Sequence, residues 1–110
     1  MKQYLLDEIP RNDIPLVRDY LQENALAARL DGIWWVDLPE DLLSPLQLEH
    51  EGCRPFRFAV EVGDDFVRFE LLIRSRQTMR CACIDYATGP QRDFILAYAD
   101  RLVEDLALRT

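Results

Sequence analysis

The feature that most constrains the fold is a strict alternation of apolar and polar side chains between residues 56 and 74. Its apolar positions are Phe56, Phe58, Val60, Val62, Val67, Phe69, Leu71 and Ile73. Alternation with period two is typical of a β-strand with one buried face, and Gly63, Asp64 and Asp65 interrupt it as a turn does. The segment therefore predicts a β-hairpin. A register that sets Glu61 opposite Arg68 keeps both apolar sets on one face.

Three other segments carry the capping and spacing signals of helices. The predicted caps are Asn12 or Asp13 for a helix over 14–25, Ser44 with Gln47 for a short helix stopped by Gly52, and Thr88 with Gln91 for a long helix ending near Leu108. A proline near the start of each helix fits its first turn, where the missing N–H is not needed. The chain therefore alternates between helical and extended segments.

Two further strands complete the predicted sheet. Residues 32–38 open on glycine and are rich in β-branched and aromatic side chains, and residues 78–86 follow a turn after the hairpin. The order of elements predicts an α+β fold in which a four-stranded antiparallel sheet packs with an N-terminal helix, a short middle helix and a long C-terminal helix. At 110 residues, we expect the chain to form a single domain over 1–110.

Charge and composition limit the classes of partner. The formal net charge is −7, and nucleic-acid affinity comes mostly from basic side chains, so we expect no nucleic-acid partner. No apolar run approaches the ~20 residues of a membrane span, so we expect no membrane association. Residues 1–13 lack the apolar run of a signal peptide, and three cysteines are an odd number for a disulfide framework. We therefore expect a cytoplasmic protein with reduced thiols.

Four residues form a candidate metal site. His50 and Cys53 lie at the end of the short middle helix, and Cys81 and Cys83 follow about thirty residues later. Zinc takes four such ligands tetrahedrally. If residues 78–86 form a strand, however, Cys81 and Cys83 stand ~6–7 Å apart and turn toward the core with Met79. Zinc binding is therefore an alternative hypothesis, and buried inert thiols are favoured.

The same residues allow a second alternative, a small cysteine-dependent enzyme. His50 would act as the base and Cys53 as the nucleophile, since a thiol needs an adjacent imidazole or positive charge to ionise at neutral pH. No phosphate-binding loop, dinucleotide fingerprint or nucleophile elbow occurs in the sequence. The favoured interpretation is therefore a protein that is not an enzyme, with no catalytic residues and no cofactor.

The leading hypothesis comes from two adjacent tryptophans. Trp34 and Trp35 must point to opposite faces of their strand, and Trp34 fits the core face. The other face then carries an aromatic and arginine-rich set consisting of Trp35, Arg57, Arg68, Arg74 and Tyr86. Either the helix over 14–25 covers this face, or it is a contact surface, because large exposed apolar patches are rare on monomers. We favour a non-enzymatic binding or protein-interaction module that forms a homodimer or binds a protein partner.

Overall fold

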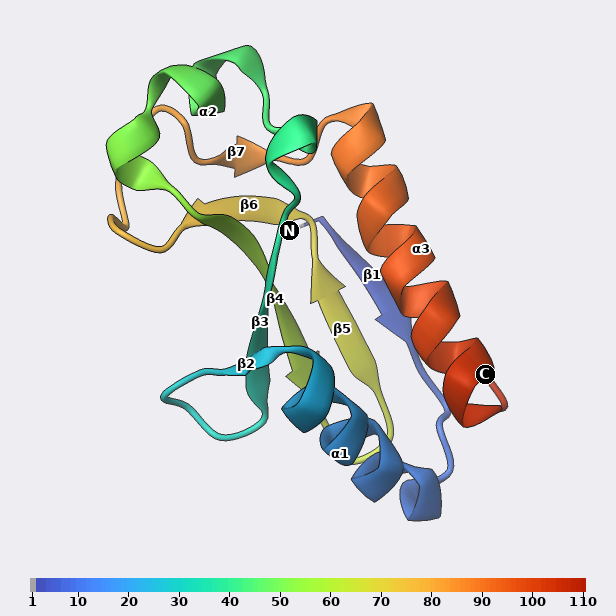
Figure 1. Cartoon of the computed structure of the whole chain (residues 1–110). Coiled ribbons are helices and arrows are strands. Elements are labelled where there is room, and N and C mark those ends of the chain that lie inside the picture. The colour runs from blue at the N-terminus through green and yellow to red at the C-terminus, as the bar shows by residue number, and fades with distance from the viewer. Residues whose placement is uncertain (1) are drawn as a thin grey trace.

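The computed structural model describes residues 2–110, which form an antiparallel sheet with two long helices on one of its faces (Figure 1). In chain order the elements are β1 (Gln3–Leu6), α1 (Ile14–Asn24), β2 (Leu26–Ala27), β3 (Ile33–Asp37), α2 (Pro45–Glu49), β4 (Phe56–Val62), β5 (Val67–Glu70), β6 (Leu72–Ser75), β7 (Asp85–Tyr86) and α3 (Gly89–Leu106). Three single-turn 3-10 helices lie at Arg11–Asp13, Glu40–Leu42 and Glu51–Cys53.

The predicted hairpin is the centre of the sheet. β4 pairs with β5 in the predicted register, with Glu61 opposite Arg68. On its other side β4 pairs with β3, and the main path of the sheet runs β1-β5-β4-β3-β2. β6 continues the second strand of the hairpin beyond Leu71, and it pairs with the start of β4 and with β7. The α+β class is therefore confirmed, but the sheet has seven strands.

The prediction of a four-stranded sheet was wrong because β1 and β2 join the sheet and the second hairpin strand is divided into β5 and β6. The predicted strand over residues 78–86 is also mostly absent. Only Asp85–Tyr86 is extended and paired, and Met79, expected in the core, is 93% exposed. The hydroxyl of Ser75 accepts hydrogen bonds from the backbone N–H groups of Gln77 and Thr78 at 3.0 and 3.3 Å. A side chain that satisfies backbone donors in this way competes with a strand ladder.

The other added strands are short. β1 has three consecutive apolar residues, Tyr4 to Leu6, and no alternation, so its sequence gives no strand signal; pairing with β5 makes it a strand. β2 has two residues, and it pairs with β3. β5 and β6 meet at Leu71, whose N–H donates to the Lys2 carbonyl beside β1 and whose carbonyl accepts from the Ala87 N–H next to β7.

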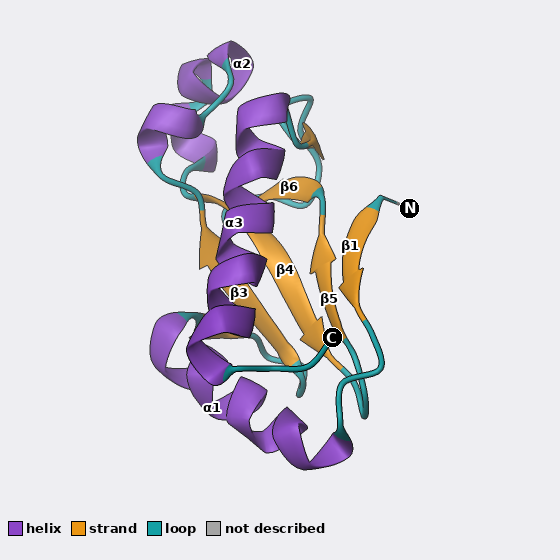
Figure 2. Ribbon diagram, turned by 90° about the vertical axis from the view of Figure 1, so that its right-hand side faces the viewer, coloured by secondary structure: helices purple, strands orange, loops and turns teal. Residues whose placement is uncertain are grey.

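Both long helices cover the face of the sheet that carries Trp34 (Figure 2). Phe58 of β4 packs edge-on against Phe94 and Tyr98 of α3, with ring centroids 6.4 and 6.1 Å apart. α1 lies on the same side, where the Trp34 indole N–H donates to Gln22 Oε1 at 3.3 Å. α1 therefore packs on the Trp34 side and not on the Trp35 side, whose side chains are half-buried.

The predicted helix starts are confirmed for α2 and α3, where Ser44 with Gln47 and Thr88 with Gln91 form complete capping boxes. α1 begins after a 3-10 turn, and its N-cap Asp13 makes no side-chain capping bond. Among residues 2–110, no helix combines the length and apolar character needed to cross a bilayer.

Candidate metal centre

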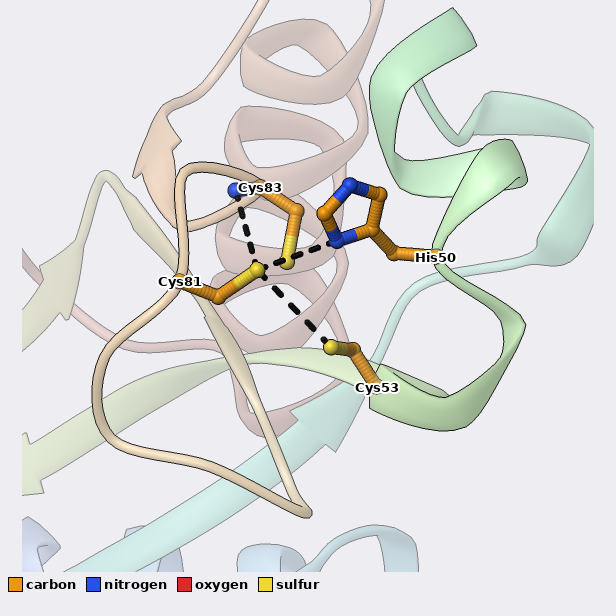
Figure 3. Close-up of side chains that lie close together, drawn as sticks. All are labelled: His50, Cys53, Cys81 and Cys83. Atoms are coloured by element: carbon orange, nitrogen blue, oxygen red, sulfur yellow. Dashed lines mark hydrogen bonds between the residues drawn. The ribbon is translucent and has the colours of Figure 1, made fainter.

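The four candidate ligands converge on one point beyond the end of the main sheet (Figure 3). His50 Nδ1 lies 3.0 Å from Cys81 Sγ, and Cys53 Sγ lies 3.9 Å from the same sulfur. With Cys83 included, all four ligand atoms lie within 4.8 Å of one another. The cysteines were expected to lie too far apart for one ion because residues 78–86 were predicted to form a strand. Cys81 and Cys83 lie outside any strand, so that expectation was wrong.

His50 and Cys53 are placed by a tight turn of the backbone. His50 is the C-cap of α2, and Cys53 ends the 3-10 turn that follows. The Cys53 N–H donates to the His50 carbonyl at 2.9 Å. Because three residues complete one turn of a 3-10 helix, the two side chains emerge on the same side.

Cys81 and Cys83 also lie on a turn, closed by a hydrogen bond from the Ile84 N–H to the Cys81 carbonyl at 3.0 Å. The turn curls around the Cys81 sulfur, which accepts from the Cys83 backbone N–H at 3.5 Å. In an extended strand alternate side chains stand farther apart. The turn therefore lets both sulfurs face the same point.

Hydrogen bonds outside the cluster fix the two turns relative to each other. Ser75 Oγ donates to the Cys53 carbonyl and also accepts from the start of the loop that carries the other cysteines. On the opposite side, Gln47 Nε2 donates to the Cys83 carbonyl at 3.3 Å. Gln47 is itself buried and accepts from Gln91 Nε2 at 2.9 Å. Such contacts behind the ligands orient them before any ion binds.

The spacing of the ligand atoms suits a small tetrahedral cation. Zinc bound at ~2.3 Å by sulfur and ~2.0–2.1 Å by nitrogen requires ligand atoms ~3.4–3.8 Å apart. The separation of 3.9 Å between the sulfurs of Cys53 and Cys81 meets this value, and the His50 contact at 3.0 Å is somewhat shorter. Because all four ligand atoms lie within 4.8 Å of one another, shifts of about an ångström would complete the coordination.

The thiols differ in acidity. Hydrogen bonds from the Cys83 thiol and backbone N–H, and then from His50 and Cys53, lower the pKa of Cys81 to about 7. Burial, followed by the hydrogen bonds of its thiol to Cys81 and Cys53, raises the pKa of Cys83 to about 12. Cys81 is therefore the first of these two thiols to become a thiolate, the form that binds metal.

The contacts around His50 differ from those expected for a cysteine-dependent enzyme. The imidazole contacts Cys81, and not Cys53, which was the predicted nucleophile. Four ligands also complete a tetrahedral site, whereas catalytic zinc sites keep one position for water or substrate.

The residues of the predicted contact surface do not form one group. Trp35 and Arg57 stack, with the guanidinium 3.9 Å from the ring centroid. Arg68 and Arg74 share this face of the sheet, but each forms a 2.6 Å ion pair, with Glu61 and Glu70 respectively. Tyr86 lies apart on β7, where Lys2 Nζ sits 5.3 Å from its ring centroid.

Sequence reasoning missed several residues. Arg29 and Arg76 line a hollow together with Trp35 and Arg57. Arg76 lies in the turn after β6 and Arg29 lies in a loop, and neither position belongs to a sequence pattern that predicts its direction. Gln47 and Gln91 were identified only as caps, yet both are buried and bonded to each other.

Comparisons with protein-family models, with curated proteins and with solved structures find no match to this chain.

Proposed function

We propose that this protein binds one zinc ion through His50, Cys53, Cys81 and Cys83, and that the ion joins the segment around α2 to the loop between β6 and β7. The observation that carries the proposal is the convergence of one imidazole nitrogen and three sulfurs within 4.8 Å. The chain has one histidine and three cysteines, so every residue of these two types takes part. This departs from the expectation of no cofactor.

The ligand types favour zinc over other common cations. Thiolates are soft ligands that select zinc, copper(I) or iron–sulfur clusters, whereas magnesium and calcium prefer oxygen. Three sulfurs and one imidazole form a recognised structural zinc set, and the tetrahedral spacing described above suits it. A closed set of ligands also agrees with the hypothesis that the protein is not an enzyme.

The structural role follows from what the ion would join. His50 and Cys53 belong to the segment around α2, and Cys81 and Cys83 belong to the long loop between β6 and β7. The His50–Cys81 contact spans 31 residues of chain. Binding energy gained only in the folded state adds to folding stability, so zinc would stabilise both segments.

The test is the metal content of protein purified without a chelator. Elemental analysis should find about one equivalent of zinc, since structural sites bind it tightly at neutral pH. Cys53→Ser and Cys81→Ser should each lower the content severalfold. Replacing zinc with cobalt(II) should add the near-ultraviolet absorption of cobalt–thiolate bonds, and this absorption should be weaker in each variant.

Met79→Ser is the matched control, because Met79 lies in the same loop but is 93% exposed and contributes no ligand atom. It should retain the zinc content of the natural chain. A content below about a tenth of an equivalent in the natural chain, or an equal loss in the Met79 variant, would contradict the proposal.

A further inference from the structure

The face of the sheet away from the long helices contains a hollow of about 520 Å³. Trp35 and Ile33 of β3 and Ala27 of β2 form part of its lining. Three arginines, Arg29, Arg57 and Arg76, also line it, and they come from three separate segments. Ligand sites typically occupy ~300–1,000 Å³, with apolar walls and a few polar groups.

The hollow is positive in a protein whose net charge is −7. Among residues 2–110, the lining contains no acidic side chain, and none of these arginines has a carboxylate within 4.0 Å. Burial, and then the charge of Arg76, lower the pKa of Arg57, while Asp37 partly opposes them. Among the described residues, the three charges therefore have no ion-pair partner, and Asp37, which lies opposite Arg57 on the neighbouring strand, opposes the loss of charge only in part.

The arrangement of Arg57 points to a ligand. Its guanidinium lies over the Trp35 ring, 3.9 Å from the ring centroid, and its Nε is buried without a hydrogen-bond partner among the described residues. Buried donors normally have partners. The Nε of Arg68 also lacks a partner, but the Arg68 guanidinium forms an ion pair with Glu61, as that of Arg74 does with Glu70. Among the described residues, Arg57 forms no ion pair of this kind.

We infer that the hollow binds an acidic segment of a partner protein, with its carboxylates on Arg29, Arg57 and Arg76 and an apolar side chain over Trp35. Several carboxylates on one chain can meet three arginines at once, and guanidinium groups bind carboxylates through two parallel hydrogen bonds. Leu26 and Leu30, 51% and 70% exposed on β2 and the adjoining loop, provide apolar contact area near the hollow. Tryptophan and arginine also contribute most often to binding energy at interfaces.

Charge argues against two other occupants. A symmetric dimer formed through this hollow would set the three arginines of one copy against the same arginines of the other, because both copies use the same patch. A nucleic acid would meet three positive charges on a chain that is strongly negative elsewhere. The inference therefore replaces the expected homodimer with an acidic partner, and it does not depend on zinc binding.

The test measures the fluorescence anisotropy of a fluorescein-labelled decapeptide of alternating glutamate and leucine as the full chain, as purified without a chelator, is added to it. A matched peptide with glutamine in place of every glutamate should bind at least about tenfold more weakly, because it lacks the charged partners. Arg76→Gln and Arg57→Gln should each weaken binding of the acidic peptide by about three- to tenfold. Arg76 is exposed, so its variant tests the hollow without disturbing the sheet.

Arg92→Gln is the control, since it removes the same charge from an exposed position on α3, in the helical layer. It should bind the peptide like the natural chain. The inference is overturned if the acidic peptide does not bind at about 1 mM protein, the weakest affinity expected of a specific contact. It is also overturned if Arg92→Gln weakens peptide binding as much as Arg76→Gln does. Displacement of the peptide by inorganic phosphate at the peptide's own concentration would overturn it too. So would a dimer, seen by light scattering, that Arg76→Gln dissociates.

Discussion

Cysteines with identical chemistry have different environments in this protein. Cys83 is 2% exposed and shielded from water, whereas Cys81 is partly exposed and receives hydrogen bonds from groups around it. Burial disfavours a charged thiolate, and hydrogen bonds to sulfur favour it. The same cluster therefore contains one acidic thiol and one that stays protonated at neutral pH.

These environments predict the order in which the thiols react in zinc-free protein. Cys81, with a pKa of about 7, should react with iodoacetamide at a rate that rises as pH increases through 7 and then levels off, because only the thiolate reacts. Cys83, with a pKa of about 12, should stay unmodified over the same range. Tandem mass spectrometry, which locates the modification on Cys81 or Cys83 within one peptide, measures both rates between about pH 6 and 8.5.

Denatured protein is the reference for this experiment, because unfolding removes the differences in environment and should equalise the two rates. An apparent pKa of Cys81 near 8.5, the value of an unperturbed thiol, would show that its neighbours do not stabilise the thiolate.

The sequence predicts which way a side chain points where the residue belongs to a strand with alternating apolar and polar positions. Trp34 and Trp35 face opposite sides as expected, and Trp34 is buried, because alternation in a strand leaves no other choice. The direction of Cys81 could not be found in this way, since it depends on a turn closed by backbone and side-chain contacts. The pairing of Arg68 with Glu61, by contrast, follows from the predicted register of the hairpin.

Among the elements, the two capping boxes have a second role. Gln91 Oε1 accepts from the Thr88 N–H, and its Nε2 donates both to the Leu42 carbonyl and to Gln47 Oε1, each at 2.9 Å. Gln47 in turn contacts the Cys83 carbonyl. Buried amides thus join the starts of α2 and α3 to the loop that carries Cys81 and Cys83.

Replacing Gln91 with methionine keeps the length of the side chain but removes the amide. The Thr88 N–H and the Leu42 carbonyl then lose a partner, and a buried unsatisfied group costs about 1–3 kcal/mol. We expect the free energy of unfolding to fall by about 2–4 kcal/mol, measured by urea denaturation. Gln77→Met, at an exposed glutamine that also donates to a carbonyl, should change it by only about 0.5 kcal/mol.

Equal effects of the two glutamine substitutions would show that the buried amides add no more than a surface hydrogen bond. An effect of Gln91→Met on zinc content would further show that the amides also hold Cys83 in place.

The elements differ in how far local sequence determines them. The hairpin and α3 were predictable because period and capping act over neighbouring residues. β1 was not, because Gln3–Leu6 becomes a strand only through pairing with β5, more than sixty residues away. Residues 78–86 have apolar side chains suited to a strand, yet the Ser75 hydroxyl and the turn at Cys81 take up their backbone groups.

At the scale of the whole molecule, two regions are held together differently. The helices α1 and α3 pack on β3, β4 and β5 through fully buried side chains such as Val17, Phe58 and Phe69. The region of α2 and the β6–β7 loop instead exposes Leu46 and Leu48 and depends on buried amides and the proposed ion. Regions with less apolar burial open more easily.

Removing zinc should therefore loosen the second region while the first stays folded. At free zinc of about 100 times its Kd, the bound ion stabilises the state it binds by about 2.7 kcal/mol, which is about a hundredfold in an opening equilibrium. After addition of a chelator, the Cys53 and Ile84 amides, which donate to the His50 and Cys81 carbonyls, should exchange hydrogen about that much faster. The Val62 amide, bonded to the Gly32 carbonyl at 2.8 Å in the sheet, should keep its protection.

The matched control is Cys81→Ser, which lacks a ligand and should respond little to the chelator. If chelation speeds exchange at Val62 as much as at Ile84, the ion stabilises the whole domain and the two regions unfold together. If it changes neither amide, the ion is not part of the fold. Faster exchange at Cys53 and Ile84 without faster exchange at Val62 is the result that agrees with the proposal. In that case the core folds by apolar packing, and the metal stabilises the α2 segment and the β6–β7 loop.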